Sequence, residues 1–181
     1  MKVPVIESER LYFVPVSLAH LSQQYVNWLN DKDVYRYMET RGNYSLGMLK
    51  LFLEECEQSN KLFWAIHLKS NEQHIGNIKI DPINLIHGNA EYSIMMGRKE
   101  EWGNGYAIEA SARILKYCFD ELKLRKITLG VIKENTAAVK LYDKLGFKIE
   151  GTYQKHVIYD GKYHDVLRMA LFNSNFVYGD Q

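Results

Sequence analysis

The feature that most constrains the fold of this chain is a strand pattern that leads through a glycine-containing loop into a long amphipathic helix. Residues 90–96 (AEYSIMM) are typical of a strand, and residues 106–122 carry apolar side chains at helical spacing. Between them stands the loop Trp102-Gly103-Asn104-Gly105-Tyr106-Ala107. Its two glycines free the backbone, so that successive N–H groups can point at one anion, and the start of a helix adds unpaired donors and partial positive charge. The segment predicts a strand–loop–helix unit that can hold a pyrophosphate.

Two familiar phosphate motifs do not fit this loop. A dinucleotide fingerprint needs a third glycine three residues after the second, where this chain has Ile108. A P-loop needs Gly-Lys followed by Ser or Thr, and the sequence contains no such run. The loop therefore matches neither motif, and its two glycines taken alone fit a structural turn as well as a phosphate site.

Similar patterns recur along the chain and predict a mixed α/β (α+β) fold. Strands are expected at residues 9–16, 62–68, 75–80, 90–96, 127–132 and 147–172, the last as a hairpin that turns at Asp160-Gly161. Helices are expected at residues 18–30, 46–56, 106–122 and 136–145. We expect Pro82 to end the strand at 75–80. Because the 181 residues contain no repeat or linker, we expect a single domain over residues 1–181.

Composition excludes several classes of protein. Apolar residues make up 46% and charged residues 25%, as in ordinary globular proteins, and a net charge of +1 favours neither nucleic acid nor an anionic membrane as partner. The two cysteines, Cys56 and Cys118, cannot form a disulfide framework, and no cluster has metal-ligand spacing, so we expect no metal. With no signal-peptide pattern and no apolar run of about 20 residues, we expect a cytoplasmic protein.

A second motif lies in residues 134–147, ENTAAVKLYDKLGF. Its spacing, Asn-x-x-Ala-x-x-Leu-Tyr-x-Lys-x-Gly-Phe, resembles together with the glycine loop the GNAT superfamily of acetyl-CoA-dependent N-acetyltransferases. The opening Ser8-Glu9-Arg10-Leu11 and the ending Asp165-Val166-Leu167-Arg168-Met169 resemble its RimJ/RimL-like branch. The resemblance covers nearly the whole chain. It implies a mixed, mostly antiparallel central sheet flanked by about four helices.

The resemblance also implies that acetyl-CoA binds as co-substrate. The positions that match or flank the family's cofactor-binding residues are Met95, Met96, Arg98, Trp102, Gly103, Asn104, Gly105, Tyr106, Ala107 and Asn135. Asn135 would contact the pantetheine arm, cap a helix, or do both. One position departs from the family, since Glu100 stands where Gln or Arg is usual. A carboxylate repels a pyrophosphate, so we expect Glu100 to point away and backbone N–H groups, with Arg98 or Lys99, to hold the phosphates.

Two catalytic roles follow from the resemblance. Tyr142 matches the family's tyrosine and would protonate the departing thiolate, with a core tyrosine as the alternative interpretation. A base must take a proton from the amine, and Glu91 is our candidate for it. His156, His164 and Asp165 are alternative bases.

The motifs leave the amine acceptor open. The resemblance implies a small-molecule or peptide amine: a 4-amino sugar on a nucleotide, a protein N-terminus or a polyamine. The expected acceptor region comprises the first two helices, the loop at residues 35–44 and the terminal hairpin. It is rich in tyrosine, carries Arg36 and Arg41, and shows no acidic cluster of the kind a polyamine site should have. We therefore favour the amino sugar and expect a monomer or homodimer. A non-catalytic acyl-CoA sensor is the alternative of another class.

Overall fold

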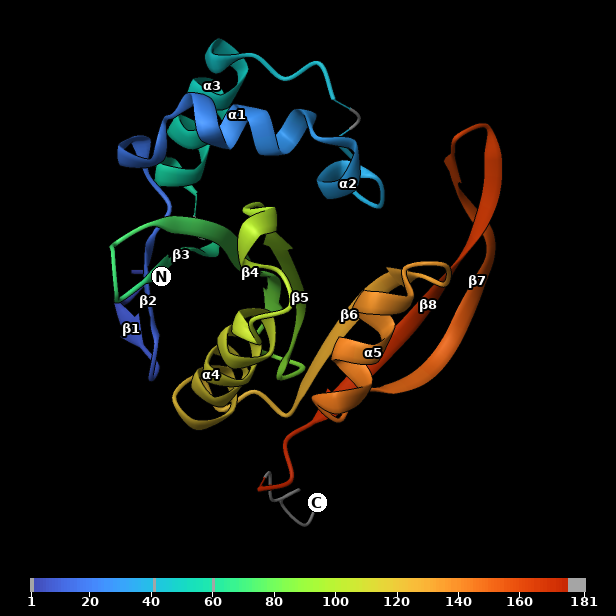
Figure 1. Cartoon of the computed structure of the whole chain (residues 1–181). Coiled ribbons are helices and arrows are strands. Elements are labelled where there is room, and N and C mark those ends of the chain that lie inside the picture. The colour runs from blue at the N-terminus through green and yellow to red at the C-terminus, as the bar shows by residue number, and fades with distance from the viewer. Residues whose placement is uncertain (1, 41, 60, 176–181) are drawn as a thin grey trace. The chain divides into compact units, whose positions relative to one another are not determined.

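The computed structural model of the chain (Figure 1) describes residues 2–40, 42–59 and 61–175. The strands are β1 (Ile6–Glu7), β2 (Leu11–Pro15), β3 (Leu62–Leu68), β4 (His74–Asn84), β5 (Asn89–Met96), β6 (Lys126–Ile132), β7 (Lys148–Tyr159) and β8 (Lys162–Phe172). The helices are α1 (Gln23–Asn30), α2 (Lys32–Tyr35), α3 (Leu46–Gln58), α4 (Tyr106–Asp120) and α5 (Thr136–Lys144), with 3₁₀ turns η1 (Leu18–His20) and η2 (Lys99–Glu101). Arg41, one of the two arginines considered for the acceptor region, lies outside the described residues.

The described strands form one eight-stranded sheet in the order β1-β2-β3-β4-β5-β6-β8-β7. Antiparallel pairing joins β1 to β2, β2 to β3, β3 to β4, β6 to β8 and β7 to β8. β5 and β6 instead pair in parallel, from Asn89 opposite Lys126 to Glu91 opposite Thr128. A parallel pair needs a long crossover, and the connection that contains α4 provides it. The predicted mixed, mostly antiparallel fold is confirmed, with five α-helices among the described residues where about four were expected.

Contacts divide the chain into two compact units. The first comprises Met1–Asp81 and Ser93–Ala110, and the second comprises Pro82–Tyr92 and Ser111–Gln181. In the first unit, a buried cluster joins α1 and α3 to β3. Its members are Val16, Tyr25, Val26, Trp28, Leu29, Leu49, Leu53 and Ala65.

Serine side chains cap η1, α1 and α3 in the first unit. Ser45 caps α3, which begins at residue 46 as the sequence predicted. The single helix expected at residues 18–30 is instead divided in two. Ser17 caps η1, and Ser22 caps α1 by accepting a hydrogen bond from the backbone N–H of Tyr25 at 3.2 Å. Because Ser22 has extended backbone angles, one helix cannot pass through it.

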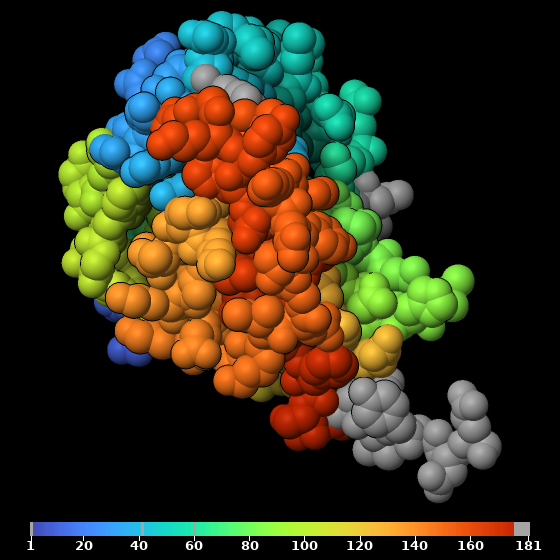
Figure 2. Space-filling view, turned by 90° about the vertical axis from the view of Figure 1, so that its right-hand side faces the viewer, coloured from blue at the N-terminus to red at the C-terminus, as the bar shows by residue number. Residues whose placement is uncertain are grey.

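The second unit has its core between α5, the later turns of α4, and strands β6 and β8. Its buried side chains include Tyr92, Ile114, Leu115, Cys118, Leu129, Val131, Tyr142, Phe147 and Met169. The β7–β8 hairpin (orange to red in Figures 1 and 2) turns at Asp160 and Gly161, whose φ values of 47° and 72° fit the Asp-Gly signal. This predicted hairpin is confirmed.

Pro82 does not end β4, contrary to the expectation from sequence. The strand continues to Asn84, although its pairing with β3 ends at Ile80. A proline cannot donate to a ladder, but it is tolerated where a strand has lost a neighbour. The extension leads into a turn (light green in Figure 2) that presents Leu85 and Ile86 to solvent, 62% and 92% exposed.

Candidate functional site

The glycine loop lies in the first unit, between the end of β5 and the start of α4. Gly103 and Gly105 have φ values of +82° and +80°, in the left-handed region that other residues rarely adopt. A Cβ atom at Gly103 would meet no described atom within 4 Å, so open space adjoins this part of the backbone. α4 begins at Tyr106, and the first turn of any helix has N–H groups without partners inside the helix. The predicted strand–loop–helix unit is therefore present.

Residues near the start of the chain anchor this loop. Arg10 donates from Nη1 to the carbonyl oxygen of Asn104 at 3.0 Å and from Nε to Glu109 Oε2 at 2.7 Å. The Ser8 hydroxyl donates to Glu109 Oε1 at 2.7 Å, and the guanidinium of Arg10 lies 4.5 Å from the centre of the Tyr106 ring. Partial burial opposes ionisation of Glu109, but hydrogen bonds from Arg10 and Ser8 lower its pKa. These contacts tie the first turn of α4 to the start of β2.

Several of the predicted cofactor residues contact one another inside this segment. Trp102 donates from Nε1 to the carbonyl oxygen of Met96 at 2.9 Å. The Asn104 amide donates to Glu101 Oε2 at 2.9 Å. Met95 is partly buried against the hydrophobic cluster of the first unit. The Met96 carbonyl thus already accepts one hydrogen bond, and a carbonyl oxygen can accept a second.

Charged residues beside the loop pair with one another. Glu100, at the position that departs from the family, has a side chain 75% exposed, with Oε2 3.8 Å from Arg98 Nε. Lys99 lies 2.8 Å from an Asp31 oxygen and 3.0 Å from an Asp33 oxygen, and these hydrogen bonds raise its pKa. The two carboxylates therefore balance the positive charge of Lys99. Of the two basic residues, Arg98 is the better candidate for a phosphate contact.

Tyr142 lies on α5 in the second unit, within an aromatic cluster with Tyr92 and Phe147. Its ring centre is 6.0 Å from that of Tyr92 and 5.8 Å from that of Phe147. Tyr142 is 7% exposed, and burial raises the pKa of its hydroxyl to about 12. Among the described residues this hydroxyl forms no hydrogen bond, whereas the Tyr92 hydroxyl and Ser111 Oγ are bonded at 2.6 Å. The Tyr142 phenol is therefore protonated at neutral pH, as a proton donor must be.

Asn135 stands at the start of the helix that carries Tyr142. Its Oδ1 accepts a hydrogen bond from the backbone N–H of Ala138 at 3.3 Å, so it is the N-cap of α5. The cap uses the amide oxygen, and the amide nitrogen is the group with which Asn135 could contact a ligand.

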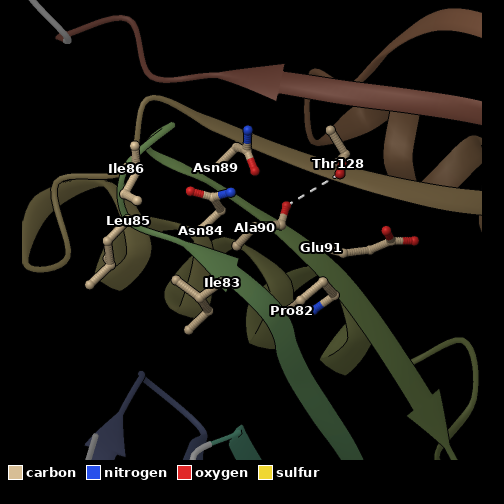
Figure 3. Close-up of a pocket in the computed structure, with 9 residues that line it drawn as sticks. All are labelled: Pro82, Ile83, Asn84, Leu85, Ile86, Asn89, Ala90, Glu91 and Thr128. Atoms are coloured by element: carbon tan, nitrogen blue, oxygen red, sulfur yellow. Dashed lines mark hydrogen bonds between the residues drawn. The ribbon is translucent and has the colours of Figure 1, made fainter.

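Glu91 lies on β5 in the second unit, where it pairs with Arg168 on β8. Arg168 Nη1 and Nη2 donate to the two carboxylate oxygens at 2.9 and 3.2 Å. Glu91 also lines an open pocket of about 620 Å³ (Figure 3). The other lining residues are Pro82, Ile83, Asn84, Leu85, Ile86, Asn89, Ala90 and Thr128. In the sequence, Arg168 stands out only as part of the terminal motif. Its partner Glu91 can be identified only once the order of the strands is known.

The alternative bases all have structural contacts within the second unit. The His156 ring lies 4.9 Å from the Tyr153 ring, centre to centre. His164 Nδ1 is 3.2 Å from Glu134 Oε2. Asp165 accepts a backbone N–H at 2.9 Å from the bulge of β7 that begins after Tyr153. Each contact gives the residue a role in shaping the hairpin.

Residues 10–148 match the family model described as the acetyltransferase (GNAT) domain. The chain belongs to this family. The matched segment includes the glycine loop of the first unit and both Glu91 and Tyr142 of the second. The single GNAT domain expected over residues 1–181 stays a prediction.

Relatives of this GNAT chain carry acetyltransferase names. It is 39% identical over 103 residues to the spermidine N(1)-acetyltransferase of Vibrio cholerae, a match that covers 57% of this chain and 59% of that protein. It is 26% identical over 168 residues to YoaA, an uncharacterised N-acetyltransferase of Bacillus subtilis, covering 90% and 93% of the two chains. The crystal structure of the V. cholerae spermidine N-acetyltransferase in complex with CoA and spermine aligns with a TM-score of 0.82 and 28% identity, covering 94% of this chain and all of that one. The sequence match to the first of these relatives thus spans little more than half of its length.

The glycine loop suits the co-substrate that GNAT membership implies, acetyl-CoA. Open space beside Gly103 and the N-terminus of α4 would accommodate a pyrophosphate. The exposed Glu100 is paired with Arg98 and does not occupy that space. No three His, Cys, Asp or Glu side chains in the described part of the chain are grouped so as to hold a metal ion. None of the described helices is long and apolar enough to cross a membrane.

Proposed function

We propose that this GNAT protein transfers an acetyl group from acetyl-CoA directly to a primary amine, with both substrates bound at once. The glycine loop is the observation that supports this most, because its left-handed glycines adjoin open space at the start of a helix. In this proposal the backbone of residues 103–107 binds the pyrophosphate, flanked by Arg98 and Trp102. The pantetheine arm contacts the backbone of residues 95–96, and the family resemblance gives the Asn135 amide as a further candidate contact.

The amine nitrogen attacks the thioester carbon, so that a C–N bond forms and the C–S bond breaks without a covalent enzyme intermediate. Tyr142 gives its proton to the departing thiolate, and a pKa of about 12 keeps the phenol protonated until then. Glu91 takes a proton from the attacking amine, directly or through water. His164, beside Glu134, and Asp165, which accepts an N–H from the β7 bulge, stay the alternative bases.

A polyamine is the acceptor we propose to test first. Relatives named spermidine acetyltransferases support it, one of them by similarity over 94% of this chain. They favour a polyamine over the nucleotide-linked amino sugar expected from the sequence. A peptide N-terminal amine is the alternative acceptor suggested by the RimJ/RimL-like motifs at the two ends of the chain. Membership of that branch stays a prediction.

The experiment is thiol release from acetyl-CoA with spermidine, spermine, nucleotide-linked amino sugars and N-terminal peptides. We expect turnover with polyamines, and acetylated product detected by mass spectrometry. Turnover with amino sugars or peptides alone would contradict the polyamine as acceptor but support acetyl transfer to an amine. Calorimetric binding of acetyl-CoA without turnover on any amine would favour the sensor, and no binding would remove the phosphate-loop assignment.

A further inference from the structure

We propose that Arg168 is a positioning residue, which holds the Glu91 carboxylate in one orientation for the acceptor amine. This inference rests on the proposed acetyl transfer. It assigns a role to a residue on β8, in the part of the chain beyond the matched residues 10–148.

The pair joins two strands that are not neighbours. The order β5-β6-β8 places β6 between Glu91 and Arg168. Glu91 lies opposite Thr128 on β6, and Arg168 lies opposite Gly130, two residues further along the same strand and on the same face. The Arg168 side chain therefore runs across β6 and meets both carboxylate oxygens, at 2.9 and 3.2 Å. A planar fork that binds both oxygens fixes the orientation of a carboxylate as well as its charge.

One glycine, Gly130, leaves room for this crossing. Gly130 on β6 and Gly151 on β7 are the register partners of Arg168 on its two neighbouring strands. A Cβ atom at Gly130 would lie 2.9 Å from Arg168 Nη1, closer than side chains ordinarily approach. At Gly151 nothing described lies within 4 Å of such a Cβ atom. A glycine inside a strand weakens it, and at Gly130 the guanidinium explains why a side chain is absent.

The charged groups around Arg168 make Glu91 its carboxylate partner. Glu150 accepts a hydrogen bond from Lys126 Nζ at 2.6 Å, and the Tyr153 ring centre lies 5.8 Å from the guanidinium carbon. The hydrogen bond to Glu91 raises the already high pKa of Arg168, so the guanidinium stays charged. The Glu91 side chain, 38% exposed, extends from β5 at the pocket of Figure 3. It is thus held on one side and accessible on the other.

A positioning role and a structural role predict different results. Water screens a partly exposed ion pair, so the loss of Arg168 should change the thermal midpoint little. Displacement of a reacting group by about 1 Å can lower a rate by about 10²-fold. Turnover should therefore respond to Arg168 far more than stability does.

The test compares R168Q and R168K with K126Q, which breaks the neighbouring Lys126–Glu150 pair. The readouts are kcat, the acetyl-CoA KM and the thermal midpoint. R168Q is expected to lower kcat about 10²-fold with an unchanged KM. R168K is expected not to restore kcat, since one ammonium cannot hold both oxygens. K126Q is expected to match the wild type.

Two further variants show whether Arg168 acts through Glu91. G130A displaces the guanidinium without removing its charge, and should lower kcat less than R168Q does. The E91Q/R168Q double variant should be no slower than E91Q. A normal rate for R168Q, or losses that multiply in the double variant, overturns the inference and leaves acetyl transfer standing. Wild-type protein that acetylates no amine overturns the proposed function, and the role of Arg168 with it.

Discussion

Burial, rather than a hydrogen bond, raises the pKa of Tyr142. Its hydroxyl has a pKa of about 12 and no hydrogen-bond partner among the described residues, so it keeps its proton at neutral pH. We expect Y142F to lower turnover by about 10²–10⁴-fold, because the thiolate then leaves without a proton donor. The affinity for acetyl-CoA, measured by calorimetry, should stay nearly unchanged. Y117F serves as control, since Tyr117 lies on α4 in the same unit. An unchanged rate for Y142F would return Tyr142 to a packing role.

Gly103 and Gly161 are a matched pair of residues, because both adopt left-handed backbone angles. Both have a positive φ, +82° and +72°, and neither has a described atom within 4 Å of the Cβ position. Alanine at either site should cost about 1 kcal/mol in stability, because it forces a side chain into the left-handed region. We expect only G103A to weaken acetyl-CoA binding in calorimetry, since Gly161 lies in the β7–β8 turn. Equal affinities of G103A and G161A for acetyl-CoA would show that the glycine loop does not bind the phosphates.

At the scale of elements, α5 depends on a residue with two possible tasks. Asn135 caps the helix through its side-chain oxygen, so N135A should lower the free energy of unfolding by about 1 kcal/mol. Aspartate caps equally well but lacks the amide nitrogen. We therefore expect N135D to keep the thermal midpoint and lose affinity for acetyl-CoA. If N135D retains both, Asn135 is a cap and nothing more.

Elements with local signals could be predicted from the sequence, and contacts between distant strands could not. The start of α3 at Ser45 and the turn at Asp160-Gly161 each depend on a few adjacent residues. The break at Ser22 was missed because the apolar spacing continues across it, and only the extended backbone of the cap interrupts the helix.

The same limit applies to the candidate site. The glycine loop and the Tyr142 motif are continuous in sequence, so both could be found before the structure. The bonds from Arg10 to Glu109 and from Arg168 to Glu91 span 99 and 77 residues and follow only from the order and register of the strands.

At the scale of the whole molecule, two histidines in a cluster of three, His20 and His74, couple stability to pH. His20, on η1, lies with Nε2 3.3 Å from His67 Nε2, and the rings of His67 and His74 are stacked at 5.1 Å between centres. The backbone N–H of Ser17 donates to His20 Nδ1, and His67 Nδ1 lies 2.9 Å from the Glu72 carbonyl oxygen. A neutral cluster satisfies these contacts, because a second proton would place two N–H donors face to face between His20 and His67.

Burial lowers the pKa of His20, and it lowers that of His74 to about 3. Below pH 6.5, His20 and His74 therefore bind protons in the unfolded chain that they do not bind in the folded chain. The free energy of unfolding thus falls as the pH falls. The limit is about 1.4 kcal/mol per pH unit for each proton. Urea unfolding between pH 5.5 and 7.5 should show this slope, and H74Q should flatten it, because the unfolded variant has one fewer proton to gain. H87Q, at the exposed β4–β5 turn, should keep the wild-type slope. A slope in H74Q as steep as in the wild type would mean that acid destabilises the protein through groups other than His74.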